Sequence, residues 1–92
     1  MPRIDLSRQA AQFLRNLPAK QAGQIAEKLK ALGESPSGLL SEALKGYSPL
    51  RRLKSGEFRI IFVQEADAVR IRLIGKRNDD EIYKALERTW KK

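Results

Sequence analysis

The residues of this chain best suited to chemistry lie in the run 75–83, which follows a strand-like apolar segment and opens the last expected helix. Arg77 and Tyr83 stand in this run, and Arg52 and Arg59 stand in the strand-rich region before it. Guanidinium groups bind phosphate through planar, paired N–H donors. Positive charge also favours the phenolate form of a nearby tyrosine, which can then accept a proton. The pattern predicts an anion site that contains a proton-transfer group.

Composition narrows the chemistry and the partners that are compatible with this chain. The 92 residues carry 19 Lys and Arg against 11 Asp and Glu, which gives a net charge of +8. Such an excess favours a polyanionic partner, whether nucleic acid, an acidic protein or an anionic membrane. Cysteine and histidine are absent, which removes disulfides, thiolate metal sites and the commonest general acid–base group. Histidine-based ribonuclease chemistry is therefore excluded, and we expect neither a metal nor a cofactor.

Length and hydropathy predict one domain that spans residues 1–92. No segment approaches the roughly 20 apolar residues that a membrane span needs. The first residues show no apolar stretch typical of a signal peptide. We therefore expect a cytoplasmic protein with no membrane partner.

Helical periodicity dominates the first third of the chain. Ser7 is a suitable N-cap, and apolar residues at helical spacing follow it, interrupted at Pro18 and ending at Gly33. This pattern predicts a helical hairpin over residues 7–32. Residues 79–90 predict a closing helix, because acidic residues stand at its start and basic residues at its end, which matches the helix dipole.

Strand-like segments fill most of the second half. They are rich in β-branched and aromatic residues, and they span residues 50–54, 58–64 and 69–74. Weaker signals mark an edge strand at residues 2–6 and a helical turn around residues 40–44. The sequence therefore predicts an α+β fold, in which the N-terminal helical hairpin packs on one face of a three- to four-stranded antiparallel sheet and a C-terminal helix follows. We expect the helices to cover one face of this sheet.

The turn expected at Ser55-Gly56 fixes a register for the hairpin between residues 50 and 64. It pairs Lys54 with Glu57, Leu53 with Phe58, and Arg52 with Arg59. Two guanidiniums in directly opposed positions destabilise a sheet. Either these side chains splay into water, or an anion lies between them. Where the third strand leaves the sheet, Arg77 is expected to approach Arg59.

The other features of this region have two readings each. Val69, Ile71 and Leu73 alternate with Arg70 and Arg72, which predicts that the apolar set faces the helices. A Lys-Arg pair in a loop is usually solvated surface when it stands alone. An aromatic residue at helical spacing usually packs in the core, which is how we interpret Trp90. The same interpretation applies to Tyr83 unless its hydroxyl emerges among the cations.

These residues, in this order, resemble the RelE branch of the RelE/ParE toxin superfamily from bacterial toxin–antitoxin pairs. The resemblance extends over most of the chain, from the helical hairpin through Leu-Lys-Gly at residues 44–46 to the hairpin at 53–62. It closes with Ile-Gly-Lys-Arg at residues 74–77 and Glu-Ile-Tyr at 81–83. The hairpin and the terminal Gly-Lys-Arg with its tyrosine are its more specific parts.

The resemblance implies a metal-independent endoribonuclease that cuts messenger RNA in the ribosomal A site. In this reaction the 2′-hydroxyl attacks the adjacent phosphate and leaves a 2′,3′-cyclic phosphate. The implied partners are messenger RNA, the ribosome and a cognate antitoxin, whose segment is expected to fold on the toxin and place acidic residues near the cations. The implied catalytic residues are Arg52, Arg59, Arg77 and Tyr83. The implied RNA-binding residues are Arg51, Lys54 and Lys76.

Two positions depart from the family's pattern. Leu50 stands where the family can carry a further lysine, and arginine replaces lysine at position 52. Arginine is hard to deprotonate, so we assign the arginines an electrostatic role and Tyr83 the proton transfer.

Two other functions compete with this reading. A ParE-like toxin poisons DNA gyrase without catalysis of its own, but that branch generally lacks the combination of cations and tyrosine. An inactive or merely basic RNA-binding domain is the third alternative. The low aromatic content of 7% disfavours it, because RNA-binding surfaces commonly stack bases on exposed aromatic side chains.

Overall fold

The computed structural model describes residues 3–34, 41–77 and 81–89. The chain folds into five strands and three helices in the order β1 (Arg3–Leu6), α1 (Arg8–Arg15), α2 (Ala19–Glu34), β2 (Ser41–Ala43), β3 (Arg51–Ser55), β4 (Phe58–Gln64), β5 (Ala68–Lys76) and α3 (Glu81–Thr89).

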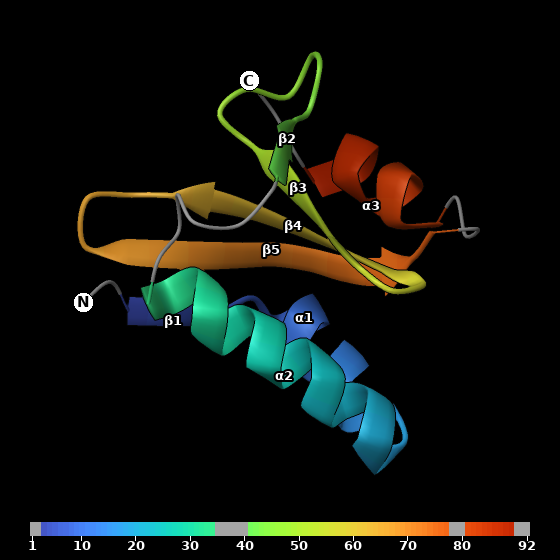
Figure 1. Cartoon of the computed structure of the whole chain (residues 1–92). Helices are drawn as coiled ribbons and strands as arrows, with labels where there is room; N and C mark the ends of the chain where they lie inside the picture. The colour runs from blue at the N-terminus through green and yellow to red at the C-terminus, as the bar shows by residue number, and fades with distance from the viewer. Residues whose placement is uncertain (1–2, 35–40, 78–80, 90–92) are drawn as a thin grey trace.

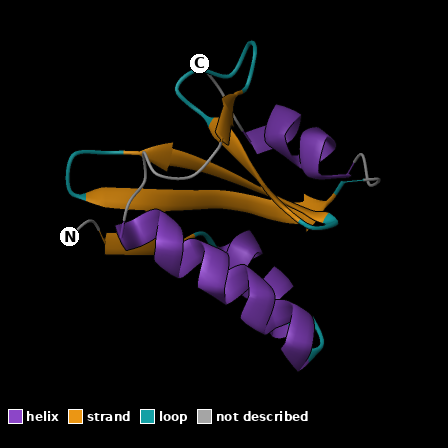
Figure 2. Ribbon diagram, viewed as in Figure 1, coloured by secondary structure: helices purple, strands orange, loops and turns teal. Residues whose placement is uncertain are grey.

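The strands form one mixed sheet in the order β1-β5-β4-β3-β2. β1 pairs with β5 in parallel, whereas the other three pairings are antiparallel. Helices α1 and α2 lie on one face of this sheet and α3 lies on the other (Figures 1 and 2). The α+β class and the helical hairpin are confirmed. The expectation of three or four antiparallel strands is wrong, as is the expectation that the helices cover one face only.

The two edge strands account for the extra strand and the parallel pairing. The weak signal at residues 2–6 corresponds to β1, which joins β5 through backbone hydrogen bonds. Residues 41–43 form β2 where a helical turn was expected, because backbone pairing with β3 outweighs the local preference of a Ser-Glu-Ala segment.

The helical hairpin largely follows its sequence signals. The Ser7 hydroxyl caps α1 by accepting a hydrogen bond of 3.1 Å from the amide of Ala10. Gly33, expected to end the second helix, instead lies inside α2 and is buried. Burial of this helix face outweighs the poor helix propensity of glycine. The closing helix, expected over residues 79–90, is described over Glu81–Thr89; its flanking residues, with Trp90, lie outside the described part.

Two apolar clusters fill the two sides of the sheet. The larger lies under α1 and α2 and includes Ile25, Leu32, Ile60 and Phe62. The smaller lies under α3 and consists of Leu50, Ile61, Leu73 and Leu86, with Tyr47 and Tyr83 packed against it. Each buried side chain of this size stabilises the fold by roughly 1.5–3 kcal/mol. The smaller cluster therefore holds α3 on the sheet.

A bulge in β5 divides its apolar residues between these two clusters. Ile61 pairs with Leu73 but the next residue, Phe62, pairs with Ile71, so that Arg72 has no partner on β4. An extra residue of this kind reverses the alternation of the strand. Val69 and Ile71 face the helical hairpin as predicted, and Arg70 and Arg72 are exposed. Leu73 is buried against α3 instead, so its predicted orientation is wrong.

The start of α1 satisfies the backbone of β5 beside this bulge. The Ser7 hydroxyl donates to the carbonyl of Arg72 at 2.6 Å. The Gln9 carboxamide accepts from the amide of Ile74 and donates to its carbonyl, both at 2.9 Å. Gln9 thus continues the edge pairing after β1 has ended, and the bulged strand keeps its hydrogen bonds.

Candidate functional site

The hairpin between β3 and β4 sets the register of the cationic side chains. Its two-residue turn is Gly56-Glu57, with Gly56 at a φ of 60°. A glycine with positive φ at the first turn position is typical of type II′ hairpins. The observed pairs are Ser55 with Phe58, Lys54 with Arg59, and Arg52 with Ile61. The predicted register is therefore wrong, because the prediction placed the turn at residues 55–56 and the observed turn lies one residue later, at residues 56–57.

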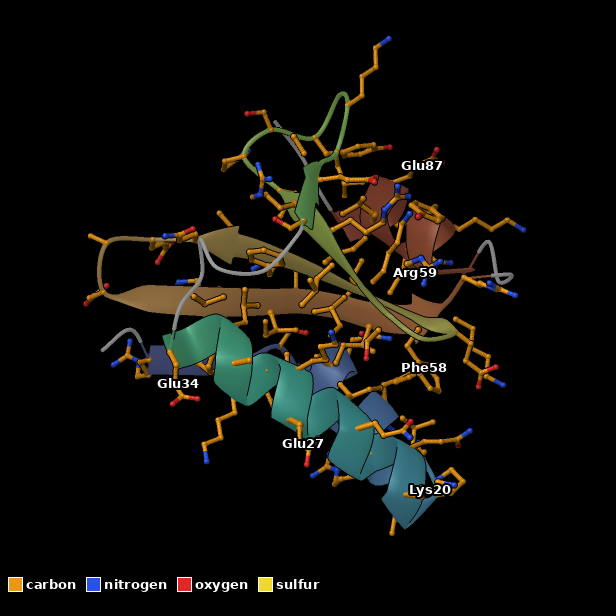
Figure 3. All side chains as sticks on the ribbon, viewed as in Figure 1. Lys20, Glu27, Glu34, Phe58, Arg59 and Glu87 are labelled. Atoms are coloured by element: carbon orange, nitrogen blue, oxygen red, sulfur yellow. The ribbon has the colours of Figure 1, made fainter. Side chains whose placement is uncertain are left out.

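The observed register still places Arg52, Lys54 and Arg59 on one face of the sheet. Directly paired residues share a face, and so do residues two apart on a strand. This is the face that α3 covers, because Ile61, the partner of Arg52, belongs to the cluster under α3. Figure 3 shows the Arg59 side chain on the side of α3 and Phe58 on the side of α2. The opposed like charges are thus Lys54 and Arg59, with Arg52 diagonal to Arg59.

Helix α3 brings Tyr83 to Arg52. Leu86 anchors the helix in the smaller cluster, and Tyr83 stands one turn earlier on the same face. Its hydroxyl oxygen accepts a hydrogen bond of 2.9 Å from Nη1 of Arg52. The structure therefore joins two of the predicted catalytic residues that lie 31 positions apart in the sequence.

Arg52 has a second partner, Glu42 on β2. Nη2 of Arg52 lies 2.5 Å from Oε2 of Glu42, and Nζ of Lys54 lies 3.7 Å from Oε1 of the same carboxylate. The hydrogen bond from Arg52 and then the charge of Lys54 lower the pKa of Glu42. The hydrogen bonds with Tyr83 and then Glu42 raise the pKa of Arg52. Both groups are therefore charged at neutral pH.

Arg59 and Arg77 lie where the hairpin turn meets the end of β5. Nη1 of Arg59 donates to the carbonyls of Gly56 and Phe58, at 3.0 and 2.8 Å. Its partner across the sheet is Gly75, which has no side chain to cover it. The amide of Arg77 donates to the carbonyl of Glu57 at 2.7 Å, and the residue is exposed. The backbone of Arg77 thus reaches the turn beside Arg59.

Two predicted RNA-binding residues lie apart from this group. Arg51 stands on the opposite face of β3 from Arg52, and its guanidinium donates to the hydroxyl and carbonyl oxygens of Ser41 at 2.8 and 2.9 Å. Lys76 pairs with Phe58, which faces the helical hairpin, although Lys76 itself is exposed. Their roles in RNA binding stay predictions.

Glu42 is the site residue that sequence reasoning missed. It stands directly opposite Arg52 on the neighbouring strand. The segment was expected to form a helical turn, which concealed its pairing with β3. The one available signal was an acidic residue ten positions before Arg52, across a segment that contains Gly46 and Pro49 and can reverse the chain.

The site is open to solvent, since the side chains of Arg52 and Lys54 are 27% and 58% exposed. A hollow between α2 and the hairpin turn is lined by Gln24, Lys28 and Phe58, but it opens on the other face of the sheet. Within residues 3–34, 41–77 and 81–89, no group of three or more acidic side chains is placed to hold a metal ion. No helix in that part of the chain is long and apolar enough to cross a membrane.

Comparisons with solved structures define the fold class. The isolated E. coli RelE toxin is 25% identical and aligns over 96% of this chain and 98% of its own, with a TM-score of 0.70. The RelBE2 toxin–antitoxin complex of Mycobacterium tuberculosis aligns at 17% identity over 84% of this chain and 100% of its own, with a TM-score of 0.73. The archaeal RelE–RelB complex of Pyrococcus horikoshii aligns at 19% identity, over 83% and 94%, with a TM-score of 0.65.

This chain therefore has the fold of the RelE toxins, as the sequence resemblance predicted. No family model matches the sequence. No curated protein matches it either. The fold assignment accordingly rests on the arrangement of strands and helices, which the alignment with the isolated E. coli RelE toxin covers over 96% of this chain.

Proposed function

We propose that this protein is the toxin of a type II toxin–antitoxin pair and acts in the cytoplasm as a metal-independent, ribosome-dependent endoribonuclease on messenger RNA. The observation that carries the proposal is the hydrogen bond between Arg52 and the hydroxyl of Tyr83. It brings a phenolic hydroxyl beside the cationic face formed by Arg52, Lys54 and Arg59, which supports a role for Tyr83 in proton transfer. The RelE-like fold supports it, because several of the similar structures are RelE toxins.

The cations supply phosphate binding and charge stabilisation. Lys54 and Arg59 oppose each other on adjacent strands, so that an anion between them relieves their repulsion. Negative charge grows on the phosphate oxygens as the 2′-oxygen attacks, and fixed cations lower the barrier by stabilising that charge. Arg77, whose backbone joins the turn beside Arg59, adds to the positive potential and stabilises the transition state.

Tyr83 moves the proton in the proposed reaction. Its hydroxyl oxygen lies 2.9 Å from Nη1 of Arg52, at the cationic face. As phenolate, Tyr83 takes the proton of the ribose 2′-hydroxyl, and the 2′-oxygen forms a bond to phosphorus. The bond from phosphorus to the 5′-oxygen breaks, and that oxygen takes a proton from solvent. The products are a 2′,3′-cyclic phosphate and a 5′-hydroxyl end.

A cognate antitoxin is the second proposed partner. The similar structures include RelE proteins in complex with RelB antitoxins. On this chain an antitoxin segment would silence the toxin by placing acidic side chains over the cationic face, as phosphates would lie there. Folding of such a segment on the surface is the usual way in which a disordered partner covers a large area.

Induced expression in bacteria, followed by mapping of messenger RNA ends, tests the enzyme reading. We expect growth arrest and new 5′-hydroxyl ends inside translated codons. Arg59→Gln should abolish both, whereas Arg70→Gln, which removes one exposed positive charge at a distant pair with Glu65, should abolish neither. Growth arrest without RNA cleavage, accompanied by inhibited DNA gyrase, would refute the ribonuclease and support the ParE-like alternative.

A further inference from the structure

An internal carboxylate contacts two residues, Arg52 and Lys54, of the cationic face that the proposed function assigns to RNA. Glu42 contacts Arg52 through one oxygen, at 2.5 Å, and Lys54 through the other, at 3.7 Å. These are two of the three residues, Arg52, Lys54 and Arg59, that form the cationic face defined above. An oxyanion that bridges both of them cannot bind while the carboxylate is in place.

The position of Glu42 is built into the sheet and does not depend on a chance surface contact. Glu42 is the direct cross-strand partner of Arg52 in the β2–β3 pairing, so the two side chains leave the same face at the shortest inter-strand spacing. Its side chain remains 55% exposed. The carboxylate can therefore swing into solvent without opening the core.

The partners of Arg52 leave its binding capacity incompletely used. Nη1 donates to Tyr83 and Nη2 to Glu42, but Nε is buried and has no hydrogen-bond partner among the described residues. A buried donor without an acceptor is unfavourable. Glu42 thus accepts a single hydrogen bond from this guanidinium. A guanidinium can instead bind one oxyanion through two parallel hydrogen bonds.

We propose that Glu42 is an internal competitor for the RNA phosphodiester, which must displace its carboxylate from Arg52 and Lys54 before cleavage. This inference rests on the proposed function, since it takes the competing ligand to be RNA. A phosphodiester and a carboxylate each carry one negative charge, so the exchange leaves the charge at the site unchanged. Apparent affinity falls in proportion to the fraction of molecules whose site is open.

Because of this competition, only RNA that binds with enough additional energy to displace Glu42 can occupy the site. A strand of RNA that contacts only these two cations exchanges one anion for another with little gain. RNA that is also held elsewhere, as messenger RNA is on a ribosome, can supply the extra binding energy that displaces Glu42. The contact of Glu42 with Arg52 and Lys54 thus favours RNA that is bound to a ribosome over RNA that is free in solution.

Binding of an uncleavable RNA tests the competition. The probe is a fluorescent 2′-O-methyl oligoribonucleotide, which lacks the attacking hydroxyl, and the readout is anisotropy at one fixed low salt concentration. The matched control for Glu42→Gln is Glu65→Gln: Glu65 is also an exposed glutamate 2.6 Å from an arginine, Arg70, so both variants gain the same charge. If the site is open in roughly a tenth to a third of wild-type molecules, Glu42→Gln should bind about three- to tenfold more tightly than Glu65→Gln.

Two further variants distinguish a failure of this inference from a failure of the proposed function. Glu42→Thr, a residue favoured in strands, repeats the test if the glutamine variant is poorly folded by circular dichroism. Equal affinities of the Glu42 and Glu65 variants, or weaker binding after substitution of Glu42, would overturn the inference. If Arg52→Gln weakens RNA binding in the same experiment, the proposed function still stands. Binding that Arg52→Gln leaves unchanged would overturn both, because RNA would then not occupy this site.

Discussion

Replacing Tyr83 with phenylalanine removes one oxygen atom from the site and little else. The ring still packs on the smaller cluster beside Leu86, but Nη1 of Arg52 loses its acceptor at 2.9 Å. If Tyr83 transfers the proton, the cleavage rate should fall by roughly 10²- to 10⁴-fold. This factor corresponds to about 2.7–5.4 kcal/mol of lost transition-state stabilisation.

The effect on stability is smaller and can be separated from the effect on rate. A hydrogen bond to a charged group contributes about 1.5–3 kcal/mol, and the Arg52 side chain is 27% exposed, so the lower end of that range applies. A domain of this length has a free energy of unfolding of roughly 5–14 kcal/mol. Loss of about 1.5 kcal/mol therefore leaves more than roughly 99% of the molecules folded. A rate loss of 10²-fold or more cannot come from unfolding.

Tyr47 provides the matched control. It is the other of the two tyrosines in the chain, and it also packs on the smaller cluster, so Tyr47→Phe makes the same chemical change and leaves the hydrogen bond between Arg52 and Tyr83 intact. The assay is the single-turnover rate of messenger RNA cleavage on purified ribosomes, with urea unfolding of each variant. If Tyr83→Phe cleaves within threefold of wild type, or if the two variants lose rate equally, the assignment of proton transfer to Tyr83 is wrong.

Three further predictions concern the fold, its pH dependence and the antitoxin. Gln9→Ala should lower the free energy of unfolding, measured in urea, by about 2 kcal/mol, because it deletes two hydrogen bonds to the backbone of Ile74. The control Gln12→Ala, at an exposed position of the same helix, should lower the free energy of unfolding by less. The pairing of Glu42 lowers its pKa below the ordinary 4.5, so its stabilisation is present above pH 4.5 and lost as the pH falls through the lowered value. The stability difference between wild type and Glu42→Gln should therefore be largest at neutral pH and shrink as the pH falls below 4.5; a constant difference would contradict the pairing. Antitoxin affinity should fall as salt rises, and an affinity independent of salt would exclude a large charge contribution.

The sequence predicted the elements that follow from periodicity and from a single local signal. The span of β4 agrees with the expected residues 58–64, since a continuous run of β-branched and aromatic residues between turns leaves few alternatives. Ser7 caps α1 as expected, because capping depends on neighbouring residues only. The resemblance to RelE toxins correctly gave the fold class.

Long-range pairing set the features that the sequence did not reveal. A shift of the turn from 55–56 to 56–57 changes every partner in the hairpin, and both turns place Gly56 at a centre. β2 exists because β3 offers it a free edge, and only that pairing brings Glu42 to Arg52. The local residue pattern contains neither fact.

The bulge in β5 links the N-terminal helix to the proposed catalytic site on the opposite face of the sheet. If β5 alternated regularly through Arg72, with no bulge, Leu73 would share the face of Ile71, and the cluster that anchors α3 would lose one of its four buried members. The hydrogen bonds from Ser7 and Gln9 satisfy the backbone of β5 on either side of this position. They therefore stabilise the register that seats α3 and, with it, the hydroxyl of Tyr83 against Arg52. Local chain geometry at the start of α1 thus contributes to the placement of a side chain that it never touches.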